Sequence, residues 1–207
     1  MAKLNAPLFS FKASGKLAGA LVYFPWKGLN AVRQYVIPSN PKSTAQTTQR
    51  GYLGDAVDAV HTAMTDATKP LAEVDRSAYS LWASLLARPM TWFNRACKSW
   101  VDQKVAGLDG TVYRGGTLTP ADGQVTIAVY TDEIGSEDIT AGDFYYGTSK
   151  TALLNSEVAV ITKLDNEAEA AITPLVNGTK YYFQFRPSAG AGWVGADSGI
   201  YHSTPHA

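Results

Sequence analysis

The sequence predicts an α+β protein with an N-terminal β-hairpin arm, a small helical domain and a C-terminal antiparallel β-sandwich. Two short runs of β-branched and aromatic residues flank a turn within residues 20–37. Apolar residues then recur at helical spacing within residues 53–64 and again within 75–101. From residue 108 onward, short alternating runs are separated by frequent turn residues, as in a sandwich. The predicted domains are therefore residues 1–106 and residues 107–207.

The arm is predicted to be a β-hairpin with strands at residues 20–24 and 31–37. Its connection, residues 25–30, contains Gly28 and Asn30, two residue types that tolerate the positive φ of tight hairpin turns. A Pro-Ser-Asn-Pro sequence follows the second strand and ends it, because proline cannot donate to a β-ladder.

The helical domain is predicted to contain three segments. The first begins near Ser43, and Gln46 follows at the spacing of a capping box. Its expected apolar face consists of Leu53, Ala56, Val57, Val60 and Met64. Asp75 is the predicted N-cap of the second helix, and a third helical stretch covers residues 93–101.

The sandwich is predicted from its strand patterns. Val125, Ile127 and Val129 alternate with polar or small residues, which is typical of a half-buried strand. Residues 181–186 form a second strong strand, and residues 157–161 and 169–172 are shorter ones.

The formal net charge of zero hides an asymmetry. Residues 1–107 carry 13 Lys and Arg and 6 Asp and Glu, a net charge of +7, whereas residues 108–207 carry 5 and 12, a net charge of −7. Asp55 is the first acidic residue, and seven cations precede it. The basic arm is therefore expected to bind a negatively charged surface.

The C-terminal half resembles a divergent fibronectin type III (Ig-like) domain. Leu175, Gly178, Thr179 and Tyr181 occupy the places of that family's corner between strands E and F. The resemblance implies that the Tyr181 hydroxyl is buried and bonds back to the backbone of the corner. It also implies that the glycine-rich residues 189–193 form the F–G loop, and the tryptophan customary in strand B is absent.

The N-terminal half resembles an uncharacterised family that is common in phage and prophage genomes, in which a basic hairpin leads through an Asn-Pro turn into helices. The resemblance implies a virion structural protein that is made in the host cytoplasm. A capsid-decorating, minor capsid or tail-associated position fits equally well. The residues that carry the resemblance are Gly15, Lys16, Leu17, Val22, Tyr23, Lys27, Gly28, Arg33, Pro38, Asn40, Pro41, Thr44, Gln46 and Arg50.

Binding is the predicted mechanism, with other virion proteins as partners and the chain present in many copies or as a homo-oligomer. Tryptophan, tyrosine and arginine most often carry interface energy. The candidate contact residues are Trp26, Lys27, Arg33, Tyr35, Arg50 and, on the glycine-rich loop, Trp193.

Two other functions remain open at this point. The aromatic, basic arm is also typical of a nucleic-acid-binding packaging protein, because cations attract phosphates and aromatic rings stack on bases. A sandwich of this type also occurs in carbohydrate-contacting adhesin modules, and fold alone does not decide function.

Catalysis, cofactors and metal ions are not expected. The three histidines, His61, His202 and His206, do not form a zinc-binding motif, and neither a nucleophile-elbow nor a phosphate-loop motif occurs. The single cysteine, Cys97, is predicted to be a buried apolar residue. The acidic residues 132–138 are expected to form an exposed loop. No signal peptide and no apolar run of membrane-spanning length are recognised.

Overall fold

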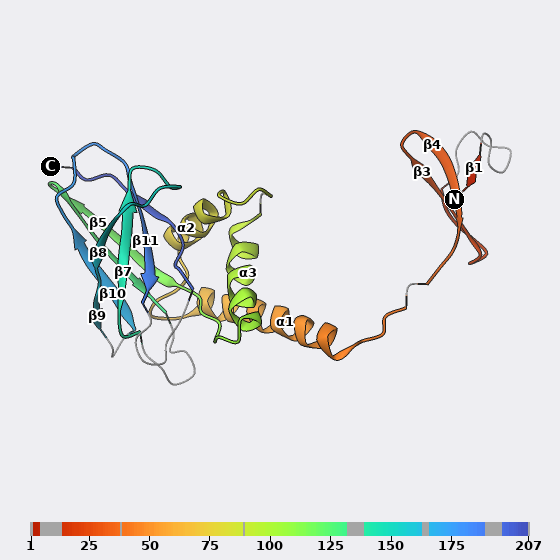
Figure 1. The fold of residues 1–207 in the computed structure, drawn as a ribbon, viewed down its shortest axis with the longest axis horizontal. Coiled ribbons are helices and arrows are strands. Elements are labelled where there is room, and N and C mark those ends of the chain that lie inside the picture. The colour runs from red at the N-terminus through yellow and green to blue at the C-terminus, as the bar shows by residue number, and fades with distance from the viewer. Residues whose placement is uncertain are drawn as a thin grey trace. The chain divides into compact units, whose positions relative to one another are not determined.

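The computed structural model describes residues 2–4, 14–37, 39–88, 90–131, 139–162, 166–188 and 196–206 (Figure 1). The chain divides into two compact units, Met1–Ser43 and Thr44–Ala207. Helices and antiparallel sheets are both present, so the α+β prediction is confirmed at this level.

The first unit is a four-stranded antiparallel sheet with the strand order β1-β4-β3-β2. The predicted hairpin is confirmed as strands β3 (Leu21–Trp26) and β4 (Leu29–Gln34). Their turn is shorter than expected, since only Lys27 and Gly28 connect them, with φ of 49° and 78° as a two-residue hairpin turn requires. The expectation of an isolated hairpin is wrong, because β1 (Ala2–Leu4) pairs with β4 and β2 (Gly15–Leu17) pairs with β3.

Three helices begin the second unit: α1 (Thr44–Thr65), α2 (Glu73–Ala83) and α3 (Trp92–Val105). The buried face of α1 contains Ala56 and Val60, as predicted, whereas Leu53 is 54% exposed. Ala56 and Val60 belong to a small core whose other members include Leu71, Tyr79, Cys97 and Trp100. Asp75 is not the N-cap of α2: that position is Ala72, whose N–H donates to the Asp75 carboxylate.

Two four-stranded antiparallel sheets complete the second unit, with strand orders β5-β6-β10-β9 and β12-β11-β7-β8. Their inward side chains form one core that includes Ile127, Phe144, Ile172, Phe183 and Phe185. The predicted 157–161 strand is divided at Ala159, so that its halves belong to different sheets. The strands are β5 (Arg114–Ala121), β6 (Gln124–Tyr130), β7 (Gly142–Gly147), β8 (Asn155–Val158), β9 (Val160–Thr162), β10 (Glu167–Ile172), β11 (Tyr181–Pro187) and β12 (Tyr201–Ser203).

The helices and the two sheets form one compact unit, so the units divide at Ser43/Thr44 and not at the expected 106/107 boundary. Ala78 of α2 belongs to the core of the sheets and its carbonyl accepts the N–H of Ile200 at 3.1 Å. The Tyr79 hydroxyl accepts the N–H of Tyr113 at 3.0 Å. A fragment of residues 108–207 therefore lacks side chains that complete its own core.

Candidate interaction surfaces

The register of the N-terminal sheet places aromatic and basic residues on one face. Side chains alternate between the faces of a strand, and directly opposed residues share a face. Val22 is opposite both Lys16 and Arg33, and Trp26 is opposite Leu29. We call this side the cationic face. Its described members are Lys16, Val22, Phe24, Trp26, Leu29, Ala31 and Arg33.

Cations and rings contact each other on the cationic face. The Lys16 ammonium lies 4.2 Å from the centroid of the Tyr35 ring and donates to its hydroxyl at 2.9 Å. The Arg33 guanidinium lies 5.4 Å from the Phe24 ring. Such contacts hold the cations over aromatic surface while leaving their charge available to a partner.

Two of the predicted contact residues, Trp26 and Arg33, are members of the cationic face, and a third, Tyr35, contacts its Lys16. Trp26 is 53% exposed, Arg33 is exposed and Tyr35 is half-buried. Lys27 is exposed in the adjoining turn. Sequence reasoning did not select Lys16 or Phe24, because only the strand register shows that they share this face.

Arg50 and Trp193 are the remaining two predicted contact residues. Arg50 is exposed on α1, in the second unit, so it is not part of the cationic face. Trp193 and the glycine-rich residues around it lie outside the described residues, as does the acidic segment 132–138.

The opposite face of the N-terminal sheet carries no charged side chain within residues 14–37. Leu17 and Leu21 are opposed there, as are Tyr23 and Val32. The one buried side chain within residues 14–37, that of Ala31, lies on the cationic face instead. Three or more strands with an apolar face covered are needed for independent stability, so this sheet gains stability from any surface that covers it.

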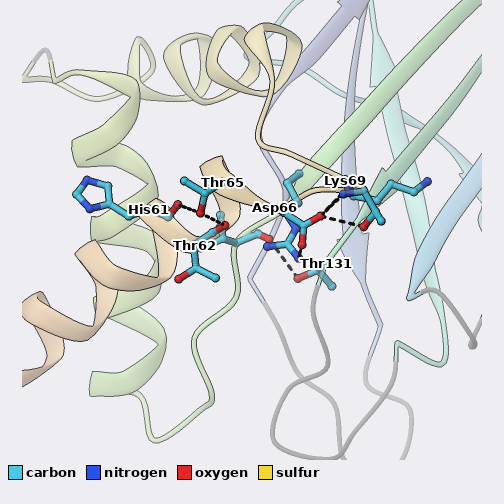
Figure 2. Close-up of polar contacts among 9 residues, drawn as sticks. His61, Thr62, Thr65, Asp66, Lys69 and Thr131 are labelled. Atoms are coloured by element: carbon cyan, nitrogen blue, oxygen red, sulfur yellow. Dashed lines mark hydrogen bonds and ion pairs between the residues drawn. The ribbon is translucent and has the colours of Figure 1, made fainter.

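Asp66 joins the helices to the sheets at the end of α1 (Figure 2). Its Oδ1 accepts the N–H groups of Thr68 at 2.8 Å and Lys69 at 2.7 Å, and its Oδ2 accepts Arg114 Nη2 at 3.1 Å. The Lys69 ammonium continues the connection to Glu167 of β10 at 3.1 Å. The backbone hydrogen bond from Lys69, followed by those from Thr68, lowers the pKa of Asp66 to about 2.

We expect Asp66 to contribute stability that depends on pH. Between 3.8, the ordinary carboxyl pKa, and about 2, the unfolded chain binds more protons at this group than the folded one. Stability from Asp66 is therefore present above this window and lost as pH falls through it. Denaturant unfolding at a series of pH values should show Asp66→Asn less stable than wild type at neutral pH, with a difference that shrinks as pH falls toward 2. Asp58→Asn, on the exposed side of α1, is the matched control, and a difference that does not change with pH would contradict the assignment.

Asp75 is a second connection between helices and sheets, and it is fully buried. Its Oδ1 accepts the Tyr201 hydroxyl at 2.8 Å and the Gly116 N–H at 3.0 Å, and its Oδ2 accepts the Ala72 N–H at 3.0 Å. Burial raises the pKa of Asp75, although these hydrogen bonds oppose the shift. Sequence reasoning could identify the helix-start signal but not the strand contacts, which come from residues far along the chain.

Cys97 lies on α3 and His61 lies on α1. The Cys97 side chain is buried, as predicted, and burial raises the pKa of its thiol, so the reactive thiolate is disfavoured. His61 is exposed, with its ring 5.6 Å from that of Phe93. Within the part of the chain that the structure describes, no three His, Cys, Asp or Glu residues are grouped as metal ligands would be. None of the described helices is long and apolar enough to span a membrane.

Comparison with protein-family models, with curated proteins and with solved structures finds no match for this chain. The chain itself consists of two compact units, one an antiparallel sheet rich in basic residues and the other a pair of antiparallel sheets braced by helices.

Proposed function

We propose that this protein is a structural component of a phage particle, present in many copies and acting by protein–protein binding rather than catalysis. A capsid-decorating, minor capsid or tail-associated role fits. The observation that carries the proposal is the cationic face on a separate N-terminal unit. The resemblance of residues 15–50 to the phage family supports the assignment to a virion.

The chemistry of the cationic face favours an acidic protein partner. Trp26, Tyr35 and Arg33 are of the types that dominate interface energy when they are buried by a partner. Lys16 and Arg33 add electrostatic complementarity, which mainly accelerates association and selects the partner. The first 54 residues contain no acid, so an acidic surface is attracted without opposing repulsion.

We also propose that the paired sheets are an Ig-like sandwich of the fibronectin type III kind. With β5 to β12 taken as strands A, B, C, C′, D, E, F and G, the two strand orders become A-B-E-D and G-F-C-C′. The Ig arrangement places the same strands together. The Tyr181 hydroxyl accepts the Val176 N–H at 3.2 Å, as the corner resemblance implies. Tyr181 is half-buried, however, so the expectation of a buried tyrosine is wrong.

Protein analysis of purified particles tests the proposed function. We expect the chain to co-purify with intact virions at a fixed stoichiometry that matches capsomers, tail rings or a single vertex. A chain that remains in the lysate while complete, infectious particles lack it would overturn the proposal.

Nucleic-acid binding is a second candidate, because the same face combines cations with the half-buried Phe24 and the exposed Trp26. Basic grooves with stacking rings bind single strands in this way. A gel-shift titration of the full chain distinguishes the two: tight, strongly salt-dependent retardation of DNA that Lys16→Glu and Arg33→Glu abolish favours packaging. An absence of retardation favours the protein partner.

A further inference from the structure

A helix covers only one of the two lateral sides of the paired sheets. Helix α2 covers the side formed by β5 and β12, through the Asp75 bond to Gly116 and the Ala78 bond to Ile200. The opposite side is formed by β8 and β9, which are the end strands of the two sheets. In Figure 1 the helices lie on one side of the sheets and β8 and β9 on the other.

The β8–β9 edge is unpaired on its outer side among the described residues and carries three exposed large apolar side chains. All four residues of β8 are exposed. Leu154, Val158 and Val160 are 86%, 73% and 70% exposed. Natural proteins usually protect edge strands, because their unpaired backbone groups accept another strand or segment. Large exposed apolar side chains on such an edge indicate a surface that a partner covers.

Acidic residues flank these apolar side chains. Glu157 precedes Val158 on β8, and Glu169 of β10 is directly opposite Val160. Both glutamates are exposed, and no described cation forms an ion pair with either of them. Val160 and Glu169 therefore share one face of the edge, whereas Glu157 and Val158 are neighbours on β8 and point to opposite faces of that strand.

The cationic face has the complementary composition, with exposed Trp26 and Leu29 at its turn end and Lys16 and Arg33 on the same face, beyond the Phe24–Ala31 pair. Residues 1–43 hold six cations and no acid, whereas residues 108–207 have a net charge of −7. Each copy of the chain therefore carries one cationic face and one β8–β9 edge, so the two surfaces are present in equal number.

We propose that the β8–β9 edge is the docking site for the cationic face of a second copy of this chain. This inference rests on the proposed function in that it names the partner of the same face. The contact is head-to-tail, because two different surfaces meet, and such contacts close into rings or extend as filaments. A multi-copy layer in a particle is built from repeated contacts of this kind.

Light scattering coupled to size exclusion, on the full chain without particles, tests the proposal. We expect wild type to form oligomers at low salt that dissociate at high salt, since surface charges are screened. The double substitution Lys16→Glu with Arg33→Glu reverses the face, and Glu157→Lys with Glu169→Lys reverses the edge. Each variant alone should lose the oligomer, because its face and its edge then have the same sign.

Mixing the two reversed variants is the decisive experiment. The negative face of one variant then meets the positive edge of the other, and the reverse pair also matches, so the mixture should regain the oligomer. The matched control is Glu73→Lys, an exposed carboxylate on the covered side, which should assemble as wild type does. Thermal melts of all variants verify that each is folded.

A wild-type chain that is monomeric at every salt concentration would overturn the proposal. An oligomer that persists in the edge-reversed variant, or that does not return on mixing, would also overturn it. Because the assay contains only this chain, its outcome is independent of whether the protein is found in particles, which tests the proposed function separately.

Discussion

Replacement of Asp75 by alanine is expected to lower the free energy of unfolding by roughly 3–5 kcal/mol. The change leaves two backbone N–H groups and the Tyr201 hydroxyl without their acceptor, at about 1–3 kcal/mol for each buried orphan. Relief of the cost of burying a carboxylate offsets part of the sum. Denaturant unfolding of the full chain measures the difference.

Two further variants separate the contributions at Asp75. Tyr201→Phe removes one of the three hydrogen bonds and should cost about 1–2 kcal/mol. Asp58→Ala, on the exposed side of α1, should cost less than about 0.5 kcal/mol. If Asp75→Ala unfolds at the wild-type denaturant concentration, the carboxylate does not connect α2 to the sheets.

The pH dependence at Asp75 has the opposite sign from that at Asp66. Burial raises the folded-state pKa of Asp75, so the folded chain binds more protons there than the unfolded chain does in the window above 3.8. Its contribution to stability therefore falls as pH rises through that window. Asp66, whose pKa is lowered, loses its contribution as pH falls.

Deletion of residues 1–43 is expected to abolish incorporation into particles while leaving the remainder folded. The second compact unit begins at Thr44, and its two cores consist of residues from that unit alone. Residues 44–207 should therefore keep a cooperative thermal transition. Particles that assemble when only this truncated chain is supplied should not contain it. Protein analysis of purified particles gives the incorporated amount.

A charge-only variant is the control for this deletion. Lys16→Gln with Arg33→Gln keeps the sheet and removes two charges from its face, so incorporation should fall without any loss of folding. A truncated chain that enters particles at the normal level would show that the first unit is not the attachment element. A truncated chain that fails to fold would place the sheet within the core of the second unit.

Local sequence signals determined several elements of this protein. Gly28 allowed the hairpin to be predicted, because the tight turn requires positive φ at that residue. The alternation of Val125, Ile127 and Val129 predicted a strand with one buried face, and all three are fully buried. The Ala56 and Val60 spacing predicted the buried face of α1. Each of these signals depends on residues only a few positions apart, so each can be recognised directly in the sequence.

The candidate site was predictable only in part. Composition identified the basic, aromatic arm, since the absence of acids before Asp55 is visible in the sequence. The selection of Lys16 and Phe24 with Trp26 and Arg33 required the register of β2, β3 and β4. A shift of one residue would move each side chain to the other face.

Tertiary structure alone decided where the chain divides and what Asp75 does. An aspartate at the start of a helix is typical of an N-cap. Asp75 instead accepts hydrogen bonds from Gly116 and Tyr201, which are 41 and 126 residues away along the chain. The 106/107 boundary follows a change in local pattern, whereas the compact unit extends across it because Ala78 and Tyr79 complete contacts with the sheets. A buried polar group must be satisfied by whichever partner the fold brings near. Sequence patterns report periodicity over a few residues, and they do not report which distant segment supplies that partner.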